Sequence, residues 1–246
     1  MVKPAIPVLF VHAFPFDSRM WQAQIDAVAG SRVVLAPDLR GFGRNRTDPY
    51  PTSIEQHARD LLAILDRSSA PRAFVVGLSM GGYIALALQR IASARVAGLM
   101  LCDTKAAADT PEARRGRDAR IERIGREGMG FLPDDMLASL VAPHCADPVK
   151  LEARRIILEQ DPRGVQCALM ALRDRPDSTS ILSSIRVPTS VVCGEHDALT
   201  PPSVMQAMAA QIPGATYVIL PHAGHLACLE NPAAFNAALS EALHRA

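Results

Sequence analysis

Short apolar stretches alternate along this chain with stretches whose apolar residues recur at helical spacing. The apolar stretches predict strands at residues 6–11, 33–36, 73–77, 96–102, 189–193 and 216–220. The helical stretches predict helices at residues 18–28, 54–66, 80–91, 202–211 and 232–244. Such alternation is typical of an α/β fold with a parallel sheet. Because the strands are continuously apolar, we expect helices to cover both faces of the sheet.

The alternation stops between residues 105 and 184. This part of the chain is helical in pattern, is interrupted by prolines and contains no convincing strand. An insertion after the fourth strand would lie at the carboxyl edge of the sheet, where ligands bind in open α/β folds. The predicted organisation is therefore an α/β core of residues 1–104 and 185–246, with a helical cap of residues 105–184.

The composition excludes several classes of protein. With a formal net charge of +1, the chain has no overall field that would attract nucleic acid or an anionic membrane surface. No stretch approaches the roughly 20 apolar residues of a membrane span. The apolar residues 2–11 are interrupted by two prolines, which favours a first strand over a signal peptide. We expect a soluble, cytoplasmic protein.

Five cysteines are scattered along the chain, and none forms a CxxC pair. This pattern argues against a disulfide scaffold or a zinc site and favours a reducing compartment. A chain of 246 residues can also bury a sizeable core without metals or cross-links. We therefore expect no structural metal.

The residues Gly77-Leu78-Ser79-Met80-Gly81 follow a predicted strand and open a predicted helix. In that context a GxSxG match indicates a nucleophile on a sharp strand-to-helix turn, with glycines on both sides to relieve crowding. The helix amino terminus adds unpaired N–H groups and a positive dipole for a developing oxyanion. Ser79 is the predicted nucleophile. An incidental serine in a glycine-rich loop is the alternative interpretation.

A serine hydroxyl needs a base to accept its proton, and in hydrolases with this turn the acid and the histidine follow the serine along the chain. Asp197 lies just beyond the strand at residues 189–193, and His225 lies beyond the strand at residues 216–220. Since the carboxyl ends of parallel strands meet at one edge of a sheet, all three residues would lie on the same rim. We predict Asp197 as the orienting acid and His225 as the base.

Each partner of the serine has competitors. Glu195 is close to Asp197 in sequence, but only one of the two carboxylates can face the histidine. His196 precedes the predicted acid, and His222 lies too close to the end of its strand to reach over the serine. Asp103 ends the fourth strand and could approach the histidine, although a capping role in its loop is the simpler interpretation.

The loop after the first strand is expected to supply one of the two oxyanion donors. It has the sequence His12-Ala13-Phe14-Pro15. The backbone N–H groups of Phe14 and Met80 are the predicted oxyanion hole, and Phe14 could also form a wall of the acyl pocket. We expect His12 to be hydrogen-bonded within its loop and to have no catalytic role.

These motifs resemble the α/β-hydrolase superfamily, in its branch of small carboxylesterases, 3-oxoadipate enol-lactonases and cofactor-free haloperoxidase-like esterases. The resemblance extends over residues 12–15, 38–43, 77–82, 194–197, 224–225 and 230–232. It implies a mostly parallel sheet in which the nucleophile, acid and histidine follow the fifth, seventh and eighth strands. Members usually begin with two further strands, which are missing here, so we expect six strands, all parallel.

One departure from the family concerns the oxyanion loop. The usual His-Gly is His12-Ala13 in this chain. If that position required a positive φ, alanine would cost of order 1 kcal/mol. The oxyanion hole would then differ in detail or accept narrower substrates.

The resemblance implies a serine hydrolase that cleaves carboxylic esters without any cofactor. A lactonase or a perhydrolase would use the same three residues, and a receptor that binds a small molecule without turnover is the non-enzymatic alternative. The expected partner is a small ester or lactone, and the cap could also form a homodimer interface.

Residues 105–126 contain seven basic and four acidic side chains. They could be a solvated helix face, or a cationic rim that selects anionic substrates.

Overall fold

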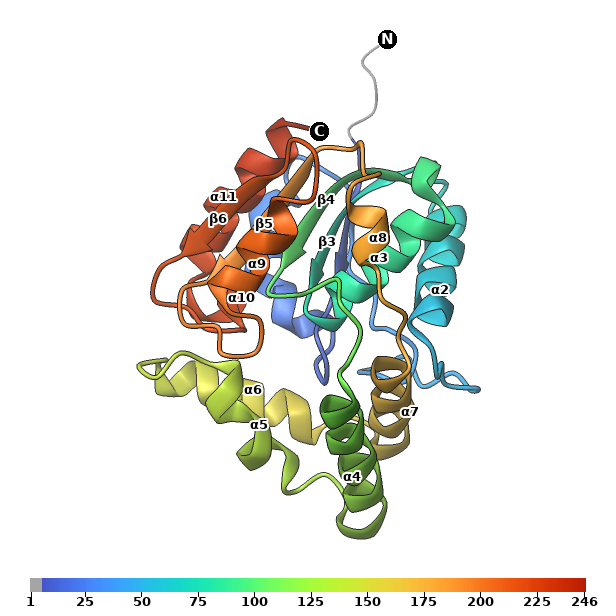
Figure 1. Ribbon diagram of the computed structural model, residues 1–246, viewed down its shortest axis with the longest axis vertical. Coiled ribbons are helices and arrows are strands. Elements are labelled where there is room, and N and C mark those ends of the chain that lie inside the picture. Colours follow the sequence, from blue (N-terminus) through green and yellow to red (C-terminus); the bar gives the residue numbers. More distant parts are fainter. Residues whose placement is uncertain (1–5) are drawn as a thin grey trace.

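A computed structural model of the chain describes residues 6–246. The sheet has six strands, all parallel, in the order β2-β1-β3-β4-β5-β6 (Figure 1). The strands are β1 Val8–Val11, β2 Val34–Leu35, β3 Ala73–Leu78, β4 Val96–Cys102, β5 Thr189–Gly194 and β6 Thr216–Leu220. The predicted α/β class and the six-stranded parallel sheet are confirmed.

Helices cover the central strands, which are buried along their whole length. The helices of this α/β part are α1 Gln22–Val28, α2 Ile54–Arg67, α3 Met80–Ile91, α8 Thr179–Leu182, α9 Pro202–Ala209, α10 Ala227–Glu230 and α11 Pro232–His244. Two 3-10 turns accompany them, η1 Ser18–Trp21 and η2 Ser93–Arg95. Helix α3 packs on β1, β3 and β4, whereas α11 packs on α1 and on β4 to β6.

Strand β1 is shorter than predicted, since pairing starts at Val8 and not at residue 6. Pro7 lacks an N–H and cannot donate to a neighbouring strand, although its carbonyl still accepts a hydrogen bond from Phe74. By contrast, α2 begins where predicted, because the Ser53 hydroxyl accepts a hydrogen bond from the backbone N–H of Gln56.

Five helices lie between β4 and β5 in the chain, and we call the first four of them the cap helices. They are α4 Pro111–Glu127, α5 Leu132–Leu140, α6 Asp147–Leu158 and α7 Pro162–Arg173. In Figure 1 they lie together beyond one end of the sheet, with α4 packed on α7 and α5 packed on α6. Within residues 6–246, no helix combines the length and apolarity needed to cross a bilayer.

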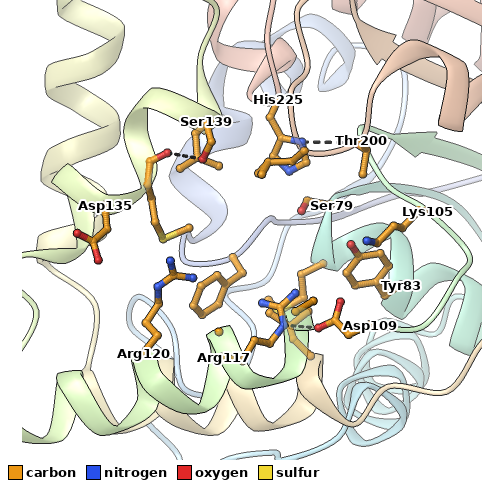
Figure 2. A pocket seen from close by; sticks show the side chains of 18 residues that line it. Ser79, Tyr83, Lys105, Asp109, Arg117, Arg120, Asp135, Ser139, Thr200 and His225 are labelled. Atoms are coloured by element: carbon orange, nitrogen blue, oxygen red, sulfur yellow. Dashed lines mark hydrogen bonds and ion pairs between the residues drawn. The ribbon is translucent and has the colours of Figure 1, made fainter. Parts of the chain in front are cut away.

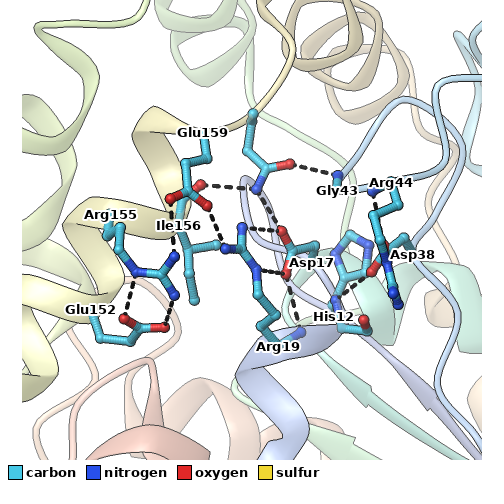
Figure 3. A network of polar contacts seen from close by, with 12 residues as sticks. His12, Asp17, Arg19, Asp38, Gly43, Arg44, Glu152, Arg155, Ile156 and Glu159 are labelled. Atoms are coloured by element: carbon cyan, nitrogen blue, oxygen red, sulfur yellow. Dashed lines mark hydrogen bonds and ion pairs between the residues drawn. The ribbon is translucent and has the colours of Figure 1, made fainter.

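A buried polar network joins the end of α6 to the loops after β1 and β2 (Figure 3). Asp17 is 1% exposed and accepts hydrogen bonds from Arg19 and from the Gln160 amide at 2.7 and 2.8 Å. The Gln160 carbonyl accepts the Gly43 N–H at 2.9 Å, and Arg19 also pairs with Glu159. Because each buried polar atom in these contacts has a partner, the network fixes the cap helices relative to the sheet.

Candidate active site

Ser79 lies on the sharp turn between β3 and α3, with φ 56° and ψ −113°. A non-glycine residue rarely adopts such a backbone conformation, and the surrounding packing must enforce it. The turn is held by hydrogen bonds from the Ser79 N–H to the Cys102 carbonyl, at 2.9 Å, and from the Thr104 hydroxyl to the Ser79 carbonyl, at 2.8 Å. A Cβ on Gly81 would lie 2.0 Å from the Val11 carbonyl oxygen. The turn therefore requires glycine at position 81.

Asp197 and His225 are brought together from the loops after β5 and β6. The distance from the His225 Nδ1 to the Asp197 Oδ2 is 2.9 Å, and both residues are almost completely buried. The backbone N–H groups of Leu199 and Thr200 donate to the Asp197 Oδ1, and the Thr200 hydroxyl donates to Oδ2. Burial alone would raise the pKa of Asp197, but its interactions with His225 and Thr200 outweigh burial and lower that pKa to about 2. Asp197 is therefore an anion at neutral pH.

Ser79 and His225 line one cavity of about 310 Å³ (Figure 2). Since the Asp197 carboxylate occupies Nδ1, the other ring nitrogen of His225, Nε2, remains for a proton transfer. The Ser79 hydroxyl makes no hydrogen bond to His225 within residues 6–246. In ligand-free hydrolases such bonds often tighten only when substrate binds, so the arrangement suits a nucleophile and its base.

The predicted oxyanion donors also lie at this cavity, which both Phe14 and Met80 line. Neither backbone N–H has a hydrogen-bond acceptor in the described part of the chain. His12 has the expected structural place: its Nδ1 donates to the Ala13 carbonyl at 2.9 Å, and its Nε2 accepts the Leu39 N–H at 3.0 Å. Ala13 does not adopt a positive φ, so the alanine brings no backbone strain to this loop.

The rival acids and bases lie outside the cavity. The exposed Glu195 accepts the backbone N–H of His222, and its carboxylate is 3.6 Å from the His196 Nε2. The rings of His196 and His222 both pack edge-on against His144. None of these side chains contacts His225 within hydrogen-bond distance.

Asp103 is fully buried, adopts a φ of 44° and lies beside the predicted triad acid. Its Oδ1 accepts the Gly194 N–H at 2.7 Å, whereas its Oδ2 has no hydrogen-bond partner within residues 6–246. Burial, together with the negative charge of Asp197, raises the pKa of Asp103 well above its usual range. Two adjacent carboxyl groups in a buried site cannot both ionise easily, so Asp103 is the protonated member of the pair.

Replacing Asp103 with asparagine is expected to stabilise the protein at alkaline pH, because the amide imitates a protonated carboxyl. An unfolded aspartate loses its proton near pH 4, whereas folded Asp103 keeps it. The folded wild type therefore loses stability as pH rises from about 4 through the raised pKa, and Asp103→Asn removes this loss. Thermal unfolding at pH 5 and pH 8 should place the melting temperature of the variant above that of wild type, and this gap should be larger at pH 8 than at pH 5 by at least about 2–4 °C.

Asp26 is exposed, so Asp26→Asn serves as the control and should leave the melting temperature unchanged at both pH values. A variant less stable than wild type at pH 8 would mean that Asp103 is ionised in the folded protein.

Asp103, Cys193 and Asp197 form a buried group whose potential ligand atoms lie within 4.8 Å of one another. The group does not suit a metal ion. Burial, followed by the charge of Asp103, raises the pKa of the Cys193 thiol, whereas a metal ligand must be deprotonated. Both oxygens of Asp197 are also already occupied by hydrogen bonds.

The individual cap residues that line the cavity could not be recognised from the sequence. Five charged side chains do so: Lys105, Asp109, Arg117, Arg120 and Asp135. The apolar part of the wall is formed by Met136, Leu140, Leu172 and Leu199 together with Phe14 and Met80. The basic composition of residues 105–126 was the available signal, but it could not tell which arginines face inward.

The chain is similar in sequence and fold to several known proteins. A thermophilic esterase from Thermogutta terrifontis, solved with malate bound, is 40% identical with a TM-score of 0.94, covering 98% of this chain and 90% of that chain. The enol-lactonase from Burkholderia xenovorans LB400 is 29% identical with a TM-score of 0.89, covering 98% of this chain and 92% of that chain. A curated relative from Variovorax paradoxus, described as a candidate carbamate hydrolase (RutD), is 32% identical over 243 residues, which are 93% of this chain and 88% of the relative.

The family model for the alpha/beta hydrolase fold matches residues 6–232, which is nearly the whole chain. Together with the order of its strands and the turn at Ser79, this match shows that the chain belongs to the α/β-hydrolase family.

Proposed function

We propose that this protein is a serine hydrolase that cleaves carboxylic esters through an acyl-enzyme on Ser79. The observation that supports this most directly is the buried hydrogen bond between Asp197 and His225, beside a cavity that Ser79 also lines. A serine on a strained turn, a histidine and a buried carboxylate are the parts that acyl transfer requires.

In the first half-reaction, His225 accepts the Ser79 proton at Nε2 while Oγ forms a bond to the ester carbonyl carbon. The carbonyl oxygen becomes an oxyanion, to which the backbone N–H groups of Phe14 and Met80 donate. Such donors contribute about 3–4 kcal/mol each in comparable sites. Asp197 stabilises the imidazolium. When the ester C–O bond breaks, His225 returns the proton to the leaving alcohol.

In the second half-reaction, a water molecule attacks the acyl-enzyme and gives its proton to His225. The bond between the acyl carbon and Oγ then breaks, and the proton returns to Ser79. The carboxylic acid leaves and the enzyme is restored. Every proton and electron pair is accounted for by these residues and water, so this cycle uses no additional group.

Lactone hydrolysis is the second candidate. The 29% identity to the Burkholderia enol-lactonase over 98% of the chain favours it. In a lactone the leaving oxygen stays attached to the acyl group, so the same residues would open the ring by the same steps.

The decisive experiment combines turnover with covalent labelling. We expect the protein to hydrolyse p-nitrophenyl esters from acetate to decanoate with a preferred chain length, alongside a panel of lactones. Diethyl p-nitrophenyl phosphate should abolish this activity and add one diethylphosphoryl group to Ser79, measured by peptide mass spectrometry. His225→Ala should block both the turnover and the labelling.

Labelling at another residue, or turnover that survives full modification of Ser79, would refute the proposal. Absence of turnover on every ester and lactone would refute it as well. If lactones exceeded esters in kcat/KM, the lactonase would replace the esterase as the main activity.

A further inference from the structure

The cavity beside Ser79 has an unequal charge balance. Lys105, Arg117 and Arg120 are the basic residues of its wall, and Asp109 and Asp135 are the acidic ones. Figure 2 shows Lys105 and Arg120 reaching toward the cavity from different sides, one from the loop after β4 and the other from α4. The pairing of these charges indicates what the cavity can bind.

Both carboxylates already have arginine partners. Asp109 is paired with Arg117 at 2.5 Å and with the buried Arg175 at 2.6 Å. Asp135 is paired with Arg123 at 2.9 Å. The charges of Asp109 and Asp135 offset those of Lys105 and Arg120 only in part, since the pKa of each of these two cations is still lowered.

Lys105 and Arg120 have neither an ion pair nor a side-chain hydrogen bond within residues 6–246. Both side chains are partly buried. Burial lowers the pKa of Lys105, and the charge of Arg175 lowers it further. Burial and the charge of Arg117 likewise lower the pKa of Arg120. A partly desolvated cation without a partner is unfavourable, and an anionic ligand would remove this cost.

The positions of the arginines around α4 argue against the interpretation that all of them are ordinary solvated side chains. Arg114 and Arg115 of α4 are exposed, whereas Arg117 and Arg120 are three residues apart on the face that lines the cavity. Long basic side chains usually extend their charge into water, as the first two do. The inward pair has the opposite orientation and lies over the cavity that holds the nucleophile.

We propose that Lys105 and Arg120 form a subsite for a free carboxylate on the substrate, so that the enzyme prefers esters or lactones that carry a negative charge. Arg120 presents planar N–H donors suited to a carboxylate, and Lys105 adds a second cation in the wall of the cavity that Ser79 lines. The leucine and methionine side chains of the cavity wall would contact the apolar part of this substrate. This inference rests on the proposed function, because it names the substrate class of the same site.

The test compares ester pairs of similar size that differ in charge. Monomethyl glutarate against dimethyl glutarate places the charge on the acyl side, and carboxymethyl butyrate against isobutyl butyrate places it on the alcohol side. Initial rates are measured by proton release. For at least one pair, we expect kcat/KM of the charged ester to exceed that of the neutral ester by about 10- to 100-fold. Raising the ionic strength should reduce this ratio.

Arg120→Gln and Lys105→Met are each expected to lower the ratio of charged to neutral kcat/KM by about tenfold or more. The matched control is Arg115→Gln, which removes the same charge from an exposed position of the same helix and should leave the ratio unchanged. Because each variant is compared with itself on two substrates, a general loss of folded enzyme cancels from the ratio. Equal ratios in wild type and both variants, or a wild-type ratio below one for both pairs, would overturn the subsite.

A binding measurement separates this inference from the proposed function. Calorimetric titration of Ser79→Ala with glutarate should show binding that Arg120→Gln in the same background weakens about tenfold or more. If neutral esters are turned over through Ser79 but neither charge preference nor glutarate binding is found, the subsite is wrong and the esterase stands. If no ester or lactone is hydrolysed but glutarate binds through Arg120, the subsite stands and the esterase is wrong.

Discussion

Replacing Ser79 with alanine is expected to lower kcat on the best ester by about 10⁵- to 10⁶-fold, because the acyl-enzyme can no longer form. The backbone strain at this position should persist, since alanine keeps the Cβ, so the melting temperature should change little. Steady-state kinetics with p-nitrophenyl esters measure the first effect, and differential scanning calorimetry measures the second.

Ser139→Ala provides the matched control for this prediction. Ser139 also lines the cavity, but its hydroxyl donates to the Met136 carbonyl within its own helix. Its loss should change kcat by less than about tenfold, as expected for a residue outside the reacting atoms. Comparable losses in the two variants would argue that the cavity responds to any change in its polarity and that Ser79 is not the nucleophile.

Replacing Gly81 with alanine is expected to destabilise the protein by at least about 3 kcal/mol, which is near the upper end for a single overpacked methyl group. The new Cβ would lie 2.0 Å from the Val11 carbonyl oxygen and 3.1 Å from that of His12. Both atoms belong to the backbone, so the loop after β1 must move away from α3. That movement would also displace Phe14, and we expect the folded fraction to lose most of its activity.

Gly116→Ala is the control for the change from glycine to alanine. Gly116 lies inside α4, and a Cβ there would meet nothing within 4 Å. The substitution should therefore stabilise the protein by about 0.5–1 kcal/mol through its helix propensity. Urea unfolding monitored by circular dichroism gives both values. A Gly81→Ala protein as stable as wild type would show that the turn can relax without glycine.

Much of the fold followed from patterns confined to short segments. The boundaries of α3 and α11 agree with those predicted, because each helix starts beside a strong local signal, a strained serine turn in one case and an Asn231 cap in the other. The prediction was least accurate for β2, where a strand was expected at residues 33–36 and only Val34 and Leu35 are paired. It lies at the edge of the sheet, where only β1 is available to extend it.

The candidate triad was also accessible from the sequence. Ser79, Asp197 and His225 each follow the carboxyl end of a parallel strand, and topology alone then places them on one rim. The structure adds two interactions. Asp197 and His225 are joined by a hydrogen bond, and the Thr200 hydroxyl donates a second hydrogen bond to the Asp197 carboxylate. Thr200 could not be recognised beforehand, because nothing in a single threonine indicates which carboxylate its loop will bring near.

The sequence by itself determined the strand order along the chain, the glycine-flanked turn and the order of the three candidate catalytic residues. Each of these depends on backbone sterics or apolar periodicity within a few neighbouring residues. Only the tertiary structure decided that Asp103 is buried beside Asp197 and that Arg120 faces the cavity while Arg115 faces solvent. The physical reason is that these environments arise when distant segments pack, as when α4 docks on α7, and local propensity does not specify which face of a helix is then covered.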